Sequence, residues 1–354
     1  MNPKLQWLRN KLSSLDMQGM IITNPVNIKY LTGIDAEGVL LITRKENIYI
    51  TDGRYIEQIQ NTISIFDEIV IMNVKDINKD DYENFFLFCE NVGFEEDNIS
   101  YAKYKEYIRK YKINAFIETE GMIEKQRMIK DEEEIQSITK ACNITDECFK
   151  YILGYIKPYM TEKQIAYEIE EYFKRRTDGL AFDTIVLSGE NTSKPHGTPS
   201  DRKIQKQDII TIDMGCKVDG YCSDMTRTFF IGPATEEQKT VYELVLKNQN
   251  QLAESYKDGA STRQLIKQIE SDFKINGYDL IHSIGHGIGL EIHESPYIIN
   301  KTDFTLKENM IISNEPGIYV PGKFGIRIED TTQITKFGCI NLTNSDKNMI
   351  VLDF

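Results

Sequence analysis

The stretch "DIITIDMGCKVDGYCSDMTRTFF", residues 208–230, contains two β-rich runs on either side of "KVDG". Asp-Gly between two such runs is a strong signal for a tight hairpin turn. If the loop holds an even number of residues, Asp213 and Asp224 lie on the same face, opposite or diagonal, within about 4.5–8 Å of each other. In that register Cys216 and Cys222 point to opposite faces, which argues against a disulfide between them. The stretch therefore predicts a β-hairpin that brings two carboxylates together.

Two neighbouring carboxylates repel each other unless a cation lies between them. Like charges at this distance normally force a proton back onto one of the groups, whereas a metal ion holds both oxygens deprotonated. With 55 Asp and Glu residues in the chain, a single acid is more often a solvated surface charge. The metal prediction therefore depends on further ligands.

A faint internal repeat supplies two more carboxylates. "DIITIDMG" (208–215) aligns with "MIISNEPG" (310–317), which sets Asp213 against Glu315. Each segment is followed by a second β-rich run with another carboxylate, Asp224 in the first case and Glu329 in the second. The repeat predicts two similar halves that build one site between them.

The histidines are concentrated in one short segment. Of the four in the chain, three fall in "HSIGHGIGLEIH" (282–293) and the fourth is His196. Four carboxylates and one imidazole are enough ligands for two divalent ions. An oxygen-rich site with a single imidazole favours manganese, with cobalt, iron or zinc as competitors.

The length of 354 residues suggests about two domains. Residues 1–122 alternate helical and strand patterns, beginning with a helix marked by Leu5, Leu8, Leu12 and Leu15, and they include the hairpin-like "GVLLITRKENIYIT". A second amphipathic helix follows, with its stripe at Ile135, Ile138, Cys142, Thr145, Phe149 and Ile152. We therefore expect an α/β domain over 1–122 and a second domain over 123–354.

Composition excludes several classes of partner. The formal net charge of −13 would repel a phosphate backbone, so we expect no nucleic acid partner. No apolar run approaches the roughly 20 residues of a membrane span and the start does not resemble a signal peptide, so we expect a soluble protein. Six cysteines without a CxxC pair suit a reducing cytoplasm.

Five sequence blocks in order carry a resemblance to a known family: "KPHGTPSDRKIQKQD", "TIDMGCKVDGYCSDMTRT", "HSIGHGIGLEIHESP", "NEPGIY" and "GIRIEDT". They resemble the Xaa-Pro peptidases, prolidase and aminopeptidase P, of the pita-bread metallopeptidase superfamily. The N-terminal region is also similar, through "NIKYLTG" and "TDGRYIEQ". The resemblance implies an α/β (α+β) protein, with a creatinase-like N-terminal domain followed by a pita-bread catalytic domain of two similar halves.

The resemblance also implies roles for individual residues. The metal ligands would be Asp213, Asp224, His286, Glu315 and Glu329. Glu315 would also shuttle a proton, His196 and His293 would stabilise the oxyanion or hold the substrate amide, and His282 and Tyr319 would contact substrate. Arg327, two residues before Glu329, could fix a ligand carboxylate through a bidentate pair.

The expected activity is hydrolysis of the Xaa-Pro bond in short proline-containing peptides. By the resemblance, two divalent ions would activate the attacking water and polarise the scissile carbonyl, and the protein would be a homodimer whose N-terminal domains close over the neighbouring active sites. A broader-specificity aminopeptidase and a non-catalytic peptide-binding protein of the same fold are alternatives. The residues do not separate dipeptidase from aminopeptidase action.

Overall fold

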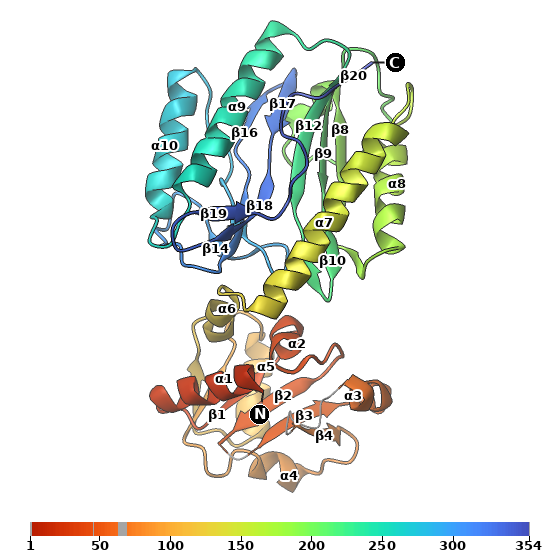
Figure 1. Cartoon of the computed structure of the whole chain (residues 1–354). Helices are drawn as coiled ribbons and strands as arrows, with labels where there is room; N and C mark the ends of the chain where they lie inside the picture. The colour runs from red at the N-terminus through yellow and green to blue at the C-terminus, as the bar shows by residue number, and fades with distance from the viewer. Residues whose placement is uncertain (1, 45, 63–68, 354) are drawn as a thin grey trace. The chain divides into compact units, whose positions relative to one another are not determined.

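The computed structural model describes residues 2–44, 46–62 and 69–353. The chain divides into two compact units, Met1–Arg127 and Met128–Phe354 (Figure 1). This division falls after helix α6 (Met122–Arg127), whereas the sequence suggested a boundary between residues 122 and 123. Helix α6 belongs to the first unit because Arg127 is buried there and donates through Nη1 to Asn27 Oδ1 at 2.9 Å.

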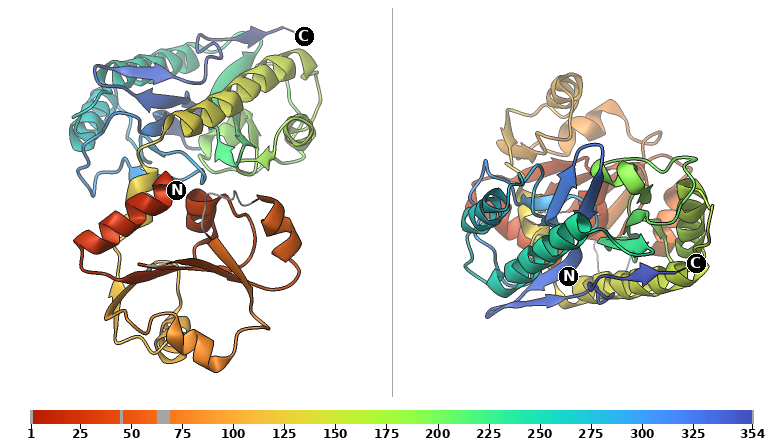
Figure 2. Two further views of the ribbon diagram at one scale, coloured as in Figure 1. Left: turned by 60° about the horizontal axis from the view of Figure 1, so that its bottom comes forward. Right: turned by 90° about the horizontal axis from the view of Figure 1, so that it is seen from above.

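The first unit is built around a six-stranded mixed sheet. Its strand order is β4-β3-β2-β1-β5-β6, and helices lie on both faces (Figure 2). The other elements of the unit, in chain order, are α1 (Pro3–Ser14), β1 (Gly19–Ile22), α2 (Pro25–Thr32), β2 (Val39–Thr43), β3 (Asn47–Thr51), α3 (Ile56–Thr62), β4 (Ile69–Asn73), α4 (Lys79–Asn84), β5 (Asn91–Phe94), α5 (Tyr101–Lys110) and β6 (Ala115–Glu118).

Local patterns account for much of this unit. The expected hairpin is confirmed, since β2 and β3 pair antiparallel. Leu5, Leu8 and Leu12 are buried on α1 as the helical spacing predicts. Leu15 is 46% exposed because the helix ends at Ser14, and the chain has already left the buried face at that point.

The second unit contains helices α7 (Glu132–Tyr155), α8 (Glu162–Lys174), α9 (Glu236–Ser255) and α10 (Thr262–Ile275), and a short 3₁₀ turn over Gly189–Ser193. Its strands are β7 (Gly179–Leu180), β8 (Ile185–Ser188), β9 (Ile209–Met214), β10 (Cys216–Val218), β11 (Tyr221–Cys222), β12 (Met225–Ile231), β13 (His286–Gly287), β14 (Glu294–Tyr297), β15 (Ile311–Asn314), β16 (Gly317–Val320), β17 (Phe324–Arg327), β18 (Asp330–Ile334), β19 (Cys339–Asn341) and β20 (Val351–Leu352).

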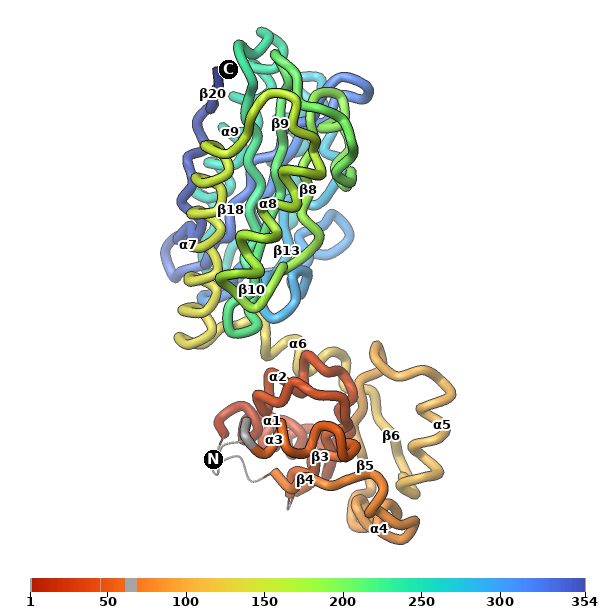
Figure 3. The backbone as a smooth tube through the Cα atoms, turned by 90° about the vertical axis from the view of Figure 1, so that its right-hand side faces the viewer, coloured from red at the N-terminus to blue at the C-terminus, as the bar shows by residue number. Residues whose placement is uncertain are grey.

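Two similar halves make up this unit. The first half packs α7 and α8 on the sheet β20-β12-β9-β8, and Figure 3 shows these two helices side by side over β8 and β9. The second half combines α9 and α10 with the sheet β14-β13-β15-β18-β19. Each half contains a central antiparallel pair, β9 with β12 and β15 with β18. The segments that the sequence repeat aligned thus occupy corresponding strands.

Helix α7 buries the stripe that its sequence predicts, except for Ile135, which is half-buried. Ile138, Cys142, Thr145, Phe149 and Ile152 are all buried, and the helix starts in a capping box between Asp131 and Glu134. All six cysteines are free, in agreement with the sequence expectation. None of the helices in the described part of the chain is long and apolar enough to cross a membrane.

Candidate metal centre

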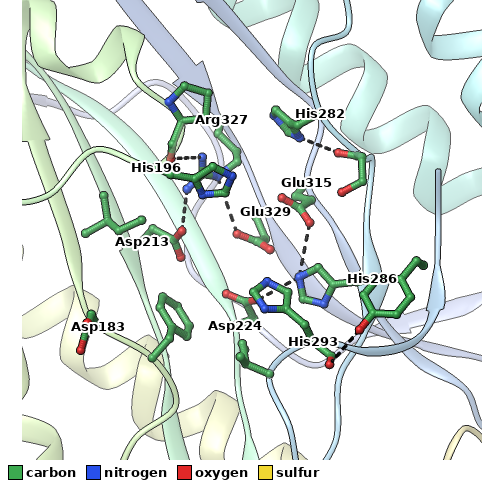
Figure 4. Close-up of a pocket in the computed structure, with 16 residues that line it drawn as sticks. Asp183, His196, Asp213, Asp224, His282, His286, His293, Glu315, Arg327 and Glu329 are labelled. Atoms are coloured by element: carbon green, nitrogen blue, oxygen red, sulfur yellow. Dashed lines mark hydrogen bonds and ion pairs between the residues drawn. The ribbon is translucent and has the colours of Figure 1, made fainter. Parts of the chain in front are cut away.

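All five candidate ligands line one cavity of about 540 Å³ in the second unit (Figure 4). They come from strands and strand ends that are far apart in sequence. Asp213 lies on β9, Asp224 directly before β12, His286 at the start of β13, Glu315 directly after β15, and Glu329 directly before β18. Tertiary folding therefore gathers the five side chains around a common space.

The hairpin between β9 and β12 places the first two carboxylates. Asp213 pairs with Thr226, so Asp224 lies diagonally across the ladder, as the sequence predicted. The chain reverses at Asp219 and Gly220, which both have positive φ (53° and 82°) as a two-residue type I′ turn requires. Because the turn fixes the register, it also fixes the face on which both carboxylates lie.

His286 is oriented as a ligand would be. Its Nδ1 lies 3.1 Å from the carbonyl oxygen of Gly287, which favours a proton on that nitrogen and leaves Nε2 with a lone pair. Nε2 lies 3.5 Å from Asp224 Oδ2 and 3.4 Å from Glu315 Oε1. Burial lowers the pKa of the imidazole, so the ring is held in the neutral form that binds metals.

Burial and mutual repulsion act on the carboxylates in the opposite direction. Burial raises the pKa of Asp224 well above its usual range, and Glu329, Asp213 and Glu315 add to the effect. Burial likewise raises the pKa values of Glu329 and Glu315. A bound cation would reverse this trend because it favours the ionised form of every oxygen that faces it.

The donor set fits divalent cations. Ligand atoms of Asp224, His286 and Glu329 all lie within 4.8 Å of one another. Asp213 Oδ1 is buried, and among the described residues it has no hydrogen-bond partner. Buried polar atoms rarely remain unsatisfied, and a cation held by the neighbouring carboxylates would give this oxygen a partner.

Arg327 stabilises the group of candidate ligands, called the cage below, which consists of Asp213, Asp224, His286, Glu315 and Glu329. Its Nη2 donates to Asp213 Oδ2 at 2.5 Å. Its Nε donates to Thr226 Oγ1 at 2.9 Å, and Thr226 donates in turn to Glu329 Oε2 at 2.6 Å. The expected bidentate pair with one carboxylate is therefore wrong, because the guanidinium distributes its nitrogens over Asp213, Thr226, Tyr319 and the carbonyl of Pro195.

His282 and Tyr319 form a pair beside the cage. Tyr319 accepts from Arg327 Nη1 at 2.8 Å, and its hydroxyl lies 3.1 Å from His282 Nε2. His282 is among the residues that line the cavity, whereas Tyr319 is not, and the Tyr319 hydroxyl is bonded to Arg327 and His282. The geometry suits a supporting position for Tyr319 better than substrate contact.

The remaining two histidines face the cavity from different loops. The ring of His293 lies 4.3 Å from that of His286 in a T-shaped arrangement, and burial together with His286 lowers its pKa. His196 lines the same cavity and is exposed. Within the described residues its imidazole makes no hydrogen bond.

Comparison with known families settles the class of this protein. Residues 136–336, more than half of the chain, match metallopeptidase family M24. The chain belongs to metallopeptidase family M24. Residues 4–129 of this M24 peptidase match the creatinase/prolidase N-terminal domain, so the first unit is the creatinase-like domain and the second is the pita-bread catalytic domain.

Relatives of this M24 peptidase match over nearly their full length. A Xaa-Pro dipeptidase of Pyrococcus furiosus is 33% identical over 356 residues, which is 99% of this chain and 100% of that one. Among solved structures, a Xaa-Pro dipeptidase from Bacillus anthracis superimposes with a TM-score of 0.91 at 34% identity, covering 99% of both chains. An X-Pro aminopeptidase from Thermotoga maritima gives a TM-score of 0.88 at 32% identity, covering 97% of this chain and 100% of that one.

Sequence reasoning missed several residues of the M24 site. Thr226 links Arg327 to Glu329, and Ser313 accepts from the backbone N–H of His286 while donating to Glu315 at 3.0 Å. Asp183 also lines the cavity, apart from the caged side chains in Figure 4. The only local signal was that Thr226 and Ser313 lie two residues from a candidate ligand, on the same strand face.

Proposed function

We propose that this M24 peptidase hydrolyses the Xaa-Pro bond of short peptides with the help of two divalent metal ions. The observation that carries the proposal is the convergence of four carboxylates and one imidazole on a single cavity. Full-length similarity to proteins named Xaa-Pro dipeptidase and X-Pro aminopeptidase supports the proline specificity.

The proposed ligands are Asp213, Asp224, His286, Glu315 and Glu329, and manganese is the proposed metal because oxygen-rich sets suit it. Two divalent ions in this site would lower the pKa of a water molecule and polarise the scissile carbonyl. Arg327 would hold Asp213 directly and Glu329 through Thr226, so that ligand oxygens keep their positions when a metal dissociates.

The other groups act on protons and on the substrate. Glu315 would take a proton from the attacking water and deliver it to the prolyl nitrogen as the C–N bond breaks. Its hydrogen bond from Ser313 fixes one carboxylate oxygen for this exchange. His293 and His196 would donate N–H groups to the carbonyl oxygen or hold the substrate amide, and His282 would line the pocket for proline.

We further propose that the enzyme works in the cytoplasm as a homodimer. The absence of CxxC pairs supports a reducing compartment. Gel filtration with light scattering would test the dimer.

The decisive experiment measures manganese-dependent hydrolysis of Ala-Pro against Ala-Pro-Pro, with Glu315→Gln as the inactive control. Cleavage of Ala-Pro alone would identify a dipeptidase, and preference for Ala-Pro-Pro would identify an aminopeptidase. Equal cleavage of Ala-Ala would favour the broader aminopeptidase. If the manganese-loaded protein cleaves none of these peptides, the proposed reaction is refuted.

A further inference from the structure

Glu162, the first residue of α8, is a fully buried carboxylate outside the metal cage. Its Oε1 accepts from the backbone N–H of Ser188 at 2.6 Å and from the Ser188 hydroxyl at 2.7 Å. Its Oε2 accepts from the N–H of Ser200 at 2.9 Å and from the Ser200 hydroxyl at 2.6 Å. Asn191 Nδ2 adds a contact to Oε1 at 3.1 Å. One side chain thus satisfies donors at both ends of a single loop.

Two physical effects stabilise the Glu162 side chain in this buried place. A carboxylate at the first turn of a helix is favoured by the helix dipole. Hydrogen bonds from N–H and O–H groups to an ionised oxygen are roughly twice as strong as neutral ones. Arg202 reinforces the arrangement by donating to the Ser188 hydroxyl at 2.7 Å while pairing with Asp208. The cluster of Glu162, Ser188, Ser200 and Arg202, called the clamp below, therefore holds both ends of the loop 189–200.

This loop carries His196. Because the His196 imidazole makes no hydrogen bond within the described residues, its place at the cavity depends on the loop backbone. Arg327 donates to the carbonyl of Pro195 at 3.3 Å, which fixes the residue next to it from the cage side. Glu162 accepts from the backbone at the two ends of the loop, at Ser188 and Ser200. Removing the Glu162 contacts would release the two ends of the loop that carries His196 while leaving the candidate ligands in place.

The second half of the unit has a different anchor at the position that corresponds to Glu162. Thr262 occupies the position of Glu162, since each follows an N-cap residue that forms an isolated bridge, Ser261 with Thr305 and Thr161 with Lys203. Among the described residues, the Thr262 hydroxyl accepts a single hydrogen bond, from the N–H of Phe304 at 2.9 Å. His293 in this half directly precedes strand β14, which is held by pairing with β13. The His196 loop has no such strand, and a buried carboxylate takes over its anchoring.

We propose that Glu162 is a positioning residue that holds His196 at the cavity, acting through the loop 189–200. This inference rests on the proposed function, in which His196 contacts the substrate. It assigns to α8 a part in the reaction although no atom of that helix lines the cavity.

A double-mutant cycle tests the assignment. In the manganese-loaded full-length enzyme, Glu162→Gln should lower kcat/KM for the preferred Xaa-Pro peptide by about 10- to 100-fold, because small displacements of a catalytic group have such effects. In the His196→Ala background the same change should lower it less than about twofold, since its effect runs through His196. Bound manganese should stay the same in all four proteins. Equal losses in both backgrounds would overturn the proposal.

Hydrogen exchange supplies a readout that does not depend on activity. In Glu162→Gln, amides of segment 188–200 should exchange faster, whereas those of β9 and β18 should not. Glu95→Gln is the matched control, because Glu95 is a buried carboxylate in the first unit that accepts from Thr23 N, Asn24 N and Asn27 Nδ2. It should leave exchange in 188–200 unchanged. Unaltered exchange of 188–200 in Glu162→Gln would also refute the clamp.

A milder variant covers the case in which Glu162→Gln does not fold. Ser200→Ala removes one donor and keeps the carboxylate, so it should show a smaller loss of kcat/KM with the same dependence on His196. Additive behaviour of Ser200→Ala and His196→Ala would count against the proposal. An inactive wild-type enzyme with the predicted exchange pattern would instead refute the proposed function alone.

Discussion

Asp213 has one oxygen bound to Arg327 and one buried oxygen without a hydrogen-bond partner among the described residues. That second oxygen is available to bind a cation, because Arg327 occupies only the first. The neighbouring Asp224 and Glu329 have raised pKa values because of burial and like charge. At the scale of residues, the site is therefore arranged for metal binding at some cost to the stability of the metal-free protein.

The variant Asp224→Asn should separate the effect of this carboxylate on metal binding from its effect on the stability of the metal-free protein. It removes a buried carboxyl group whose ionised form is disfavoured by burial and by the neighbouring carboxylates, so the free energy of unfolding of the metal-free variant should exceed that of metal-free wild type by on the order of 1 kcal/mol. It should also bind less manganese and lose activity. Urea unfolding in chelator and metal analysis would measure both. A destabilised metal-free variant would show that the carboxylates do not oppose one another.

At the scale of elements, close backbone approach decides where His286 lies. A Cβ added at Gly287 would meet the Ser295 carbonyl oxygen at 2.3 Å, because β13 and β14 run against each other there. Gly154 lies in helix α7 with open space around it. A close backbone contact therefore requires glycine at position 287, whereas no such contact requires it at position 154.

Alanine at these two positions should act in opposite directions. Gly287→Ala should destabilise the protein by about 1–3 kcal/mol and reduce metal binding, since the strand that carries His286 must shift. Gly154→Ala should stabilise it by about 0.5–1 kcal/mol through helix propensity. Guanidinium unfolding would measure both changes. A neutral Gly287→Ala would contradict the tight strand contact.

A second element-scale prediction concerns pH and the α4–α5 region of the first unit. Tyr111, directly after α5, packs edge-on against Tyr82, Phe86 and Tyr107. Burial raises the pKa of its hydroxyl, with Tyr107 and Tyr82 adding to the effect. Because the folded pKa is raised, this contribution to stability is complete below the unfolded pKa of about 10 and is lost as pH rises above it.

Tyr111→Phe should therefore weaken the alkaline loss of stability. Each tyrosine with a raised folded pKa lowers the unfolding free energy by about 1.4 kcal/mol per pH unit above pH 10. The variant lacks one such tyrosine, so its unfolding free energy should fall less steeply. Urea unfolding on both sides of that pH, followed by the fluorescence of Trp7, would measure the slope. An unchanged slope would mean that Tyr111 ionises freely in the folded unit.

At the scale of the whole molecule, all proposed ligands lie in the second unit, whereas the only tryptophan, Trp7, lies in the first. If the two units unfold independently, metal binding stabilises only the second unit, by an amount set by the metal concentration relative to Kd. Trp7 fluorescence thus reports on the first unit alone, whereas far-UV circular dichroism reports on the helices and strands of both units.

Manganese at about 100 times its Kd should raise the unfolding free energy of the second unit by about 2.7 kcal/mol. Far-UV circular dichroism should report this as a shifted transition, while Trp7 fluorescence should keep its midpoint. Chelator should abolish the shift. Equal displacement of both signals would show that the two units unfold as one.

The amino-acid sequence alone determined the features that local pattern encodes. The Asp-Gly turn set the register of β9 and β12, and hence the shared face of Asp213 and Asp224. The stripe of α7 followed from helical spacing. The carboxylates and His286 could be chosen in advance because motif order and the internal repeat marked them.

Only the tertiary structure decided how these parts are held. Arg327 distributes its nitrogens instead of forming a bidentate pair, Tyr319 is not among the residues that line the cavity, and Glu162 anchors a loop whose far end is 38 residues away in the chain. Such contacts leave no periodic signal, because they join residues distant in sequence and depend on which donors folding leaves without partners. Local propensity fixes faces and turns, whereas the burial of polar groups is settled only when the elements pack.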